Sequence, residues 1–200
     1  PVRDSHHTRE DIAIMRAIPN LRAFSPCDFW EIQEITKQVV ELGGVNYIRI
    51  DKSSAGNTRK NDEDFIVGKG RVLTDGTDVT IIATGGIVEL ALEAQKKLNS
   101  SGISCKVVSM HTIKPIDKNL IIDCVKNTGA LITLEEHSLI GGLGSAVSEI
   151  LMQESVYPKR FKMMGLESSF STIVGSQSYL RKYNNLDTSS IIKCVKKLLS

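Results

Sequence analysis

Apolar residues recur at helical spacing and at strand spacing in turn along the first fifty residues. Residues 8–18 predict a helix that begins at a sequence resembling a capping box and ends before a proline. A strand is predicted over 21–25, an amphipathic helix capped by Asp28 follows, and a second strand is predicted over 45–50. This order is expected at the end of a parallel α/β sheet. Because two strands do not form a stable sheet of this type, we expect the start of the unit to be missing or to come from another chain.

A polar stretch over 51–64 has no apolar periodicity and is expected to be a linker or a long surface loop. The alternation resumes after it, with strands over 70–74 and 78–83 around an Asp-Gly turn, which predicts a hairpin at a sheet edge. The later elements are predicted as a helix over 87–98, a strand over 105–110, a helix from 117, a strand over 130–135, a helix from 143, a strand over 161–166 and a helix over 191–199.

These alternating elements predict an α/β fold in two units. The first, over 1–64, is the end of a parallel-sheet unit with its linker, and the second, over 65–200, is a mostly parallel sheet with helices on both faces. We find no internal repeat.

A glycine-rich turn follows the apolar run at 130–135 and carries Gly141, Gly142 and Gly144. A strand that enters a helix through such a turn can hold an anion on the helix amides. The dinucleotide fingerprint fails, however, because Val147 stands where the third glycine is required, and no Gly-Lys-Ser/Thr follows. We therefore interpret the turn as tight strand-to-helix packing. A free-standing nucleotide-binding domain is kept as an alternative hypothesis.

Composition narrows the classes of function. Hydrophobic residues make up 41% and charged residues 24% of 200 residues, as in an ordinary globular protein. The net charge is +2, and aromatic residues make up 5%, so neither nucleic acid nor a membrane is expected as a partner. The four cysteines lack metal or redox spacing and are interpreted as buried, reduced thiols in a cytoplasmic protein. No apolar run in these residues is near the length of a membrane span, and we expect no signal peptide.

Adjacent histidines, His6 and His7, form the most polar cluster in the chain, between Asp4 and Glu10. Adjacent histidines are not a metal pair and a third ligand is not evident, so no metal site is predicted. A histidine in a loop before a helix can bind a substrate or move a proton near neutral pH, although a solvated loop explains the cluster as well.

Two further histidines lie in the second unit. His137, with Glu135 and Glu136, is placed directly after the strand at 130–134, where a surface turn that helps domain packing is favoured over an acid–base cluster. His111 precedes a Lys-Pro pair in a strand-to-helix loop, and packing or a solvated loop is favoured there too. A serine hydrolase has no support, because the sequence contains no G-x-S-x-G elbow.

Three segments together resemble the transketolase family. Residues 5–16 read S-H-H-T-R-E-D-I-A-I-M-R and are followed by I-P-N and S-P-C-D, where the family has T-H-Q/H-x-x-E-D-x-A-x-x-R, then P-N and P-x-D. Residues 131–147 contain T-L-E-E-H-x-x-x-G-G-x-G-S-A-V, which resembles the family's C-terminal domain. Residues 170–186 resemble the family's closing pattern of Phe, Gly-Ser, Leu, Tyr and Leu. The resemblance covers nearly all of the chain, in the family's order.

The resemblance implies that the chain is the C-terminal portion of such an enzyme. Residues 1–64 would be the end of a pyrimidine-binding domain plus linker, and residues 65–200 a complete C-terminal-type domain. The family transfers a two-carbon ketol unit between sugars with thiamine diphosphate. Its substrate-contacting histidine falls on His6, implied to be catalytic and substrate-binding. A basic residue that binds sugar phosphate in many members falls on Lys52, where the family usually has Arg.

The resemblance also implies what other parts must supply. The family's diphosphate-binding domain, with its G-D-G metal motif, and its cofactor-activating glutamate have no counterpart in these residues. We therefore expect thiamine diphosphate and Mg in the complete enzyme, neither cofactor nor metal on this chain alone, and no activity from it alone. The implied partners are an N-terminal diphosphate-binding part, in the same or a separate polypeptide, a further copy through the C-terminal domain, as in a dimer, and a sugar. Alternatives are deoxyxylulose phosphate synthase, a 2-oxoacid dehydrogenase beta-type subunit, and a non-catalytic docking or regulatory module.

Overall fold

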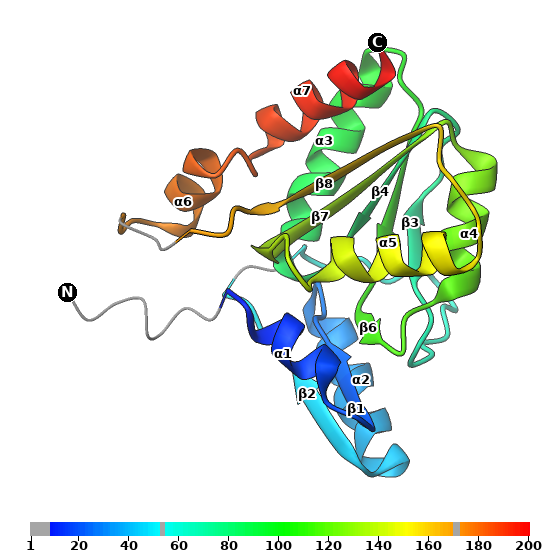
Figure 1. Ribbon diagram of the computed structural model, residues 1–200, viewed down its shortest axis with the longest axis vertical. Helices are drawn as coiled ribbons and strands as arrows, with labels where there is room; N and C mark the ends of the chain where they lie inside the picture. Colours follow the sequence, from blue (N-terminus) through cyan, green and yellow to red (C-terminus); the bar gives the residue numbers. More distant parts are fainter. Residues whose placement is uncertain (1–8, 53–54, 170–172) are drawn as a thin grey trace.

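The computed structural model describes residues 9–52, 55–169 and 173–200 (Figure 1). Its elements alternate between helix and strand, as the sequence predicts. In chain order they are α1 (Asp11–Ala17), β1 (Leu21–Phe24), α2 (Phe29–Leu42), β2 (Val45–Ile48), β3 (Arg71–Thr74), β4 (Val79–Ala83), the 3₁₀ helix η2 (Gly85–Ile87), α3 (Val88–Ser100), β5 (Cys105–Ser109), β6 (Thr112–Lys114), α4 (Lys118–Asn127), β7 (Ala130–Ser138), α5 (Leu143–Gln153), β8 (Arg160–Leu166), α6 (Gln177–Tyr183) and α7 (Thr188–Leu199).

The larger sheet has the strand order β3-β5-β4-β7-β8. β4 pairs in parallel with both β5 and β7, and β7 pairs in parallel with β8, so the prediction of a mostly parallel α/β fold is confirmed. Successive residues of β4 point to opposite faces. Ile81 packs in the cluster that contains α3 and α7, and Ile82 packs in the cluster that contains α4 and α5. Helices therefore cover both faces of the sheet, as Figure 1 shows.

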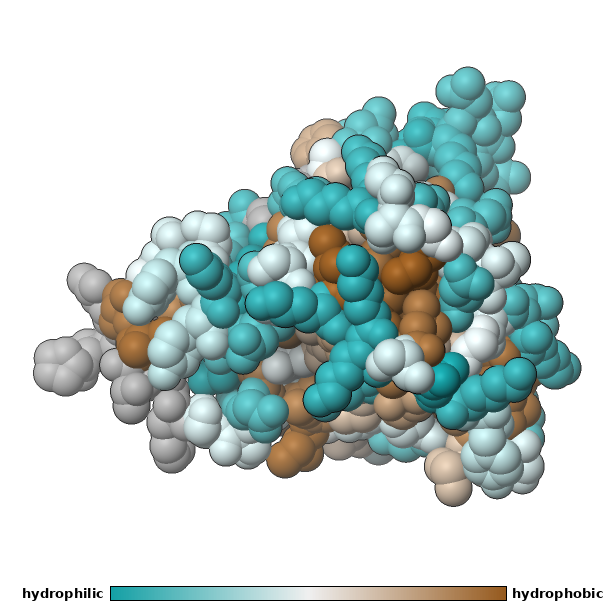
Figure 2. Space-filling view, turned by 90° about the horizontal axis from the view of Figure 1, so that it is seen from above, coloured by the Kyte–Doolittle hydropathy of each residue, from teal (hydrophilic) through white to brown (hydrophobic). Residues whose placement is uncertain are grey.

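The surface agrees with this burial. Figure 2, which looks at the molecule from above, shows a face covered mainly by hydrophilic residues, with hydrophobic ones visible between them near the middle. In the part of the chain that the structure describes, no helix is long and apolar enough to cross a membrane.

The hairpin predicted around Asp75-Gly76 is wrong. β3 pairs antiparallel with β5, and β5 lies between β3 and β4 in the sheet. The connection from β3 to β4 passes closely over the start of β5, because a Cβ on Gly76 would lie 2.3 Å from the carbonyl carbon of Cys105. An Asp-Gly turn has the same local chemistry in a hairpin and in this crossing, so the sequence signal did not separate the two.

A smaller sheet has the order β2-β1-β6 and lies below the larger one in Figure 1. β1 and β2 are parallel, as predicted, and β1 pairs antiparallel with β6, a strand the sequence did not predict. Since β6 comes from residues 112–114, the part of the chain after residue 64 contributes a strand to the sheet formed by the part before it. The division into 1–64 and 65–200 itself stays a prediction.

Two aspartates cap helices with their side chains, whereas Asp187 before α7 makes no side-chain capping bond. The Asp28 carboxylate accepts the N–H of Glu31 at the start of α2, and the Asp117 carboxylate accepts the N–H of Leu120 at the start of α4. Helix α1 differs, because its N-cap is Glu10, whose side chain makes no capping bond. Thr8, which opens the proposed capping box, lies outside the described residues.

Gly76 provides a test of the crossing between β3 and β4. We expect Gly76→Ala to lower the free energy of unfolding by about 1–3 kcal/mol, because the added methyl group would meet the backbone of Cys105, which has no room to move. The matched control is Gly129→Ala, whose Cβ would lie at an ordinary 3.5 Å from the Asp78 carbonyl oxygen. Urea unfolding of both variants measures the difference, and equal stabilities would contradict the close crossing.

Candidate functional site

The carboxyl ends of the parallel strands β1 and β2 meet at a groove of about 140 Å³. Ligands of open α/β sheets bind outside the carboxyl ends of the strands, so its position makes this groove the candidate substrate site. The residues that line it are Pro26, Cys27, Asp28, Phe29, Ile32, Asp51 and Lys52.

Lys52, the residue expected to bind substrate phosphate, is exposed and lines this groove. Its ammonium group forms no hydrogen bond or ion pair with the residues in 9–52, 55–169 and 173–200. A lysine ammonium is a compact point charge that binds phosphate without a fixed geometry. The position of Lys52 therefore agrees with an anion-binding role, which stays a prediction.

His6, expected to be catalytic and substrate-binding, lies outside the described residues, as does His7. The first described residue, Arg9, lies beside the end of β7, because its carbonyl oxygen accepts the N–H of Ser138 at 2.8 Å. A site shared by His6 and Lys52 stays a prediction.

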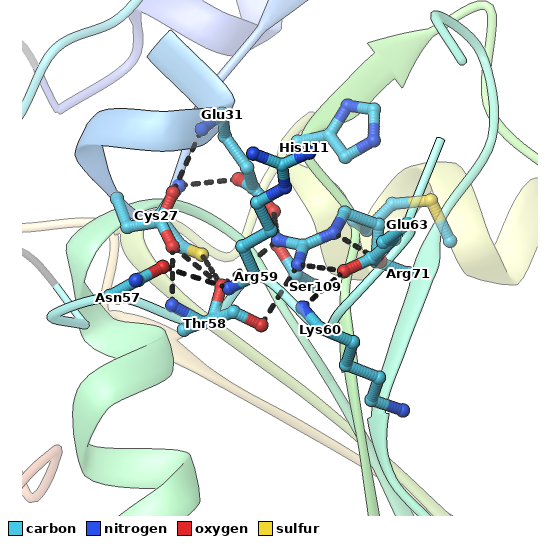
Figure 3. A network of polar contacts seen from close by, with 12 residues as sticks. Cys27, Glu31, Asn57, Thr58, Arg59, Lys60, Glu63, Arg71, Ser109 and His111 are labelled. Carbon is cyan, nitrogen blue, oxygen red and sulfur yellow. Dashed lines mark hydrogen bonds and ion pairs between the residues drawn. The ribbon is translucent and has the colours of Figure 1, made fainter. Parts of the chain in front are cut away.

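A buried ion cluster around Arg71 supports one wall of the groove (Figure 3). Nε and Nη2 of Arg71 donate to the two carboxylate oxygens of Glu63, each at 2.8 Å. Nη1 donates to Glu31 at 2.7 Å, and the remaining N–H groups reach the hydroxyl and carbonyl oxygens of Thr58. The guanidinium carbon also lies 4.4 Å from the ring centre of Trp30. Burial disfavours the charge, but the carboxylates of Glu63 and Glu31 outweigh it and raise the pKa of Arg71, so the guanidinium stays charged.

Glu31 connects this cluster to the groove. Its Oε2 accepts the N–H of Cys27 at 2.7 Å, and its Oε1 accepts the hydroxyl of Ser109 at 2.8 Å. Asp28 accepts the N–H of Thr58 at 2.9 Å, so the groove wall is tied to the segment after residue 55 as well. Burial raises the pKa of the Cys27 thiol far above its ordinary value, which makes Cys27 a packing residue rather than a nucleophile.

The glycine turn between β7 and α5 is already occupied by a carboxyl group of the chain itself. Glu135 is fully buried in β7, and its carboxylate accepts the N–H of Leu143 at 2.7 Å and of Gly144 at 2.8 Å. A Cβ on Gly142 would lie 2.1 Å from Glu135 Oε2, so glycine is needed here for close approach. The helix terminus considered for phosphate is filled by a carboxylate, which supports the packing interpretation.

The same turn seats helix α1. A Cβ on Gly141, whose φ is 77°, would lie 2.5 Å from the Cβ of Ala13. Arg16 donates to the Gly141 carbonyl oxygen at 2.7 Å and pairs with Glu149 at 2.6 Å, while the N–H of Ala13 donates to Nε2 of His137 at 3.4 Å. The glycine turn is therefore a joint between α1 and the larger sheet.

The placement of Glu135 and His137 in a surface turn is wrong. β7 continues to Ser138 and buries both side chains completely, because α1 and the glycine turn close over them. Burial lowers the pKa of His137. His111 is also buried, with its ring centre 4.2 Å from that of Phe65, and burial lowers its pKa to about 3. Both histidines are buried and neutral, and we interpret them as packing residues rather than acid–base groups.

Sequence reasoning missed the Arg71 cluster and the bond between Asp51 and Gly86, in which Asp51 Oδ2 accepts the Gly86 N–H at 2.9 Å. Neither has a motif, because the partners are far apart in the chain. The charged residues of the polar stretch over 51–64 include Glu63 and Asp51, but nothing in the stretch indicated which of them would be bound. In the described part of the chain, no group of three or more His, Cys, Asp or Glu residues is arranged to hold a metal ion.

Comparison with known proteins gives consistent matches. The family model for the transketolase C-terminal domain matches residues 68–191. A putative transketolase C-terminal section of Methanocaldococcus jannaschii is 40% identical over 191 residues, which is 94% of this chain and 59% of that protein. A 1-deoxy-D-xylulose-5-phosphate synthase of Heliobacterium modesticaldum is 34% identical over 98% of this chain and 30% of its own length.

A solved structure supports the same relationship. A split gene transketolase, described as an inactive beta4 tetramer, is 39% identical and has a TM-score of 0.85, with 98% of this chain and 62% of that chain covered. The chain thus spans 59% of the Methanocaldococcus relative and less of the synthase.

The filled helix terminus predicts how Gly142 behaves. We expect Gly142→Val to destabilise the fold by about 1–3 kcal/mol or more, since the new side chain would overlap the buried carboxylate of Glu135. We also expect NAD, ATP and thiamine diphosphate to leave the thermal midpoint of the wild-type chain unchanged. Thermal unfolding with each ligand measures both effects. A saturable rise that Gly142→Val abolishes would instead identify a phosphate site.

Glu135 predicts a pH dependence of stability. Burial raises the pKa of Glu135 from 4.5 to about 7 in the folded protein, although the hydrogen bonds from the amides of Gly144 and Leu143 lower it. The folded state then holds a proton that the unfolded state releases between these values, so this contribution to stability is full below pH 4.5 and is lost as the pH rises through 7. We expect the free energy of unfolding of wild type, minus that of Glu135→Gln, to fall by roughly 3 kcal/mol at most across this window.

The control for Glu135 is Glu149→Gln, which alters a carboxylate whose side chain is 55% exposed. The same subtraction for this variant measures the effect of removing an exposed carboxylate. Wild-type and Glu135→Gln curves that run parallel from pH 4.5 to 7.5 would contradict the raised pKa.

Proposed function

Because this chain belongs to the transketolase family and corresponds to its C-terminal portion, we propose that it forms part of an enzyme that transfers a two-carbon ketol unit between sugars with thiamine diphosphate. The observation that carries the proposal is the match of residues 68–191 to the family's C-terminal domain. It is joined by Lys52, which lies at the groove beside the carboxyl ends of the parallel strands β1 and β2 and has no polar partner among the described residues. Sugar phosphates are the proposed substrates, since an ammonium group without a partner in the described part of the chain suits an anionic group.

The described residues do not fit the diphosphate and magnesium end of the cofactor. An amide group at the start of η2 donates to the carboxylate of Asp51, and those at the start of α5 donate to the carboxylate of Glu135. These amides are therefore not available for a diphosphate. We therefore assign no chemical step of the cofactor to these residues. The diphosphate end belongs, in this proposal, to an N-terminal part in the same or a separate polypeptide.

The chain's own residues are assigned binding and orientation. His6 contacts the hydroxyl groups of the sugar near the reacting carbon, where a histidine can also move a proton. Lys52 holds the phosphate at the other end of the substrate. Two fixed ends set the substrate's position relative to the reacting centre, and positioning of this kind lowers the barrier of a reaction between two molecules.

Synthesis of 1-deoxyxylulose 5-phosphate is the second candidate function, because a synthase is among the relatives at 34% identity. The synthase usually carries Pro-Arg-Gly after the second strand, whereas this chain has Asp51-Lys52-Ser53. Ketol transfer is therefore proposed first. Assaying the assembled enzyme with a ketose donor and, separately, with pyruvate separates the two reactions.

The role of His6 gives the test of this proposal. In the enzyme assembled with its diphosphate-binding part, we expect His6→Ala to lower kcat/KM for the sugar donor by at least about tenfold, as for loss of a polar contact to the reacting substrate. His7→Ala is the matched control and should have a smaller effect. This chain alone, with thiamine diphosphate and magnesium, should show no turnover. Turnover by the chain alone, or an unchanged kcat/KM for His6→Ala with every donor, would contradict the proposal.

A further inference from the structure

Asp51, the residue before Lys52, lines the groove and is bound through its carboxylate to the part of the chain that forms the larger sheet. Its Oδ2 accepts the N–H of Gly86 at 2.9 Å, in the 3₁₀ helix η2 that leads into α3. Gly85 makes the contact possible, because its φ is 74° and a Cβ there would lie 2.6 Å from Asp51 Oδ2. The absence of a side chain at Gly85 therefore leaves room for the Asp51 carboxylate, which follows β2.

The same turn also holds the opposite wall of the groove. The N–H of Gly85 donates to the Ser25 carbonyl oxygen at 3.0 Å, and the Thr84 hydroxyl donates to the same oxygen at 3.2 Å. Ser25 directly precedes Pro26 and Cys27, which line the groove. One turn, residues 84–86, thus fixes both chain segments between which the groove lies.

The direction of Asp51 has an electrostatic consequence for Lys52. An aspartate beside a lysine in a groove would ordinarily repel a phosphate or pair with the ammonium. Here the Asp51 carboxylate is directed to the N-terminal end of a helical segment, where the peptide dipoles favour a negative charge. Lys52 has no ion pair with the described residues, so its charge is left for a ligand.

We propose that Asp51 is a positioning residue for Lys52. Asp51 is held in place by residues 84–86 of the C-terminal domain, so this domain sets the affinity for the phosphate group of the substrate. The inference deepens the proposed function and rests on its assignment of Lys52. It adds a role for a domain that carries none of the residues expected to contact substrate.

The experiment is a titration of the ¹⁵N-labelled chain with inorganic phosphate, followed through the amide signals of Lys52 and Gly86. Wild type should show a saturable shift, and Lys52→Ala should abolish it. We expect Asp51→Ala to weaken phosphate binding by about two- to tenfold, the range expected when one long side chain must be ordered on binding. Gly85→Ala should do the same from the other domain, because its methyl group would displace the carboxylate.

Asp51→Asn is the matched control, because its amide oxygen still accepts the Gly86 N–H while the charge is removed. It should bind phosphate at least as tightly as wild type, and this rescue separates positioning from general loss of fold. In the assembled enzyme, Asp51→Ala should raise KM for a phosphorylated sugar, with kcat and the KM for the unphosphorylated sugar nearly unchanged.

The outcomes separate the inference from the proposed function. If wild type shows no saturable shift, or if Lys52→Ala binds phosphate as well as wild type, the assignment of Lys52 in the proposed function fails. If Lys52→Ala weakens binding and Asp51→Ala does not, the assignment of Lys52 stands and the role of Asp51 is overturned. Equal weakening by Asp51→Asn and Asp51→Ala also overturns it, since the charge rather than the bond to Gly86 would then matter.

Discussion

The buried guanidinium of Arg71 is the constraint on which much of the structure depends. A charge removed from water is costly unless every donor finds a partner, and here the N–H groups of Arg71 reach Glu31, Glu63 and Thr58. These partners come from α2 and from the segment between the two sheets, while Arg71 itself lies in β3. The cluster explains why the polar segment around Thr58 and Glu63 is held against the core, and it extends through Glu31 to Cys27 at the groove.

Carboxylates fill the places where an open α/β sheet commonly binds its ligand. In the larger sheet β5 is added on one side of β4 and β7 on the other, so the strand order switches direction between the parallel strands β4 and β7. A crevice at such a switch point often receives a nucleotide. The helical segments after these two strands are η2 with α3, and α5, and their amides receive Asp51 and Glu135. Helix α1 and the residues after β2 pack at this crevice. Helix starts that could bind an anionic ligand therefore bind side chains of the protein and hold its parts together.

Local patterns predicted the helices and parallel strands well, because caps such as Asp28 and alternation such as Ile81 and Ile82 depend on near neighbours. They failed where distant parts meet. The Asp75-Gly76 turn gave no sign that β5 would separate β3 from β4. The burial of Glu135 and His137 arises from α1, more than a hundred residues away.

The candidate site was predicted only in part. Lys52 was found through a resemblance, and the structure places it at a groove. Its neighbour Asp51 carried no signal, because an aspartate in a polar stretch looks the same whether it faces water or caps a helix 35 residues later. The local sequence does not show which distant segment will pack against a charged group. That segment sets the group's environment, as Gly86 does for Asp51.

Strand β6 has a consequence for how the molecule comes apart. It leaves the larger unit after β5, pairs with β1 in the smaller sheet, and returns to α4. The smaller sheet is therefore completed by a strand of the larger unit, and it cannot separate from that unit without losing β6. A protease cut within residues 51–64 would nick the polypeptide without releasing a compact fragment, and heating should melt both sheets in a single cooperative transition.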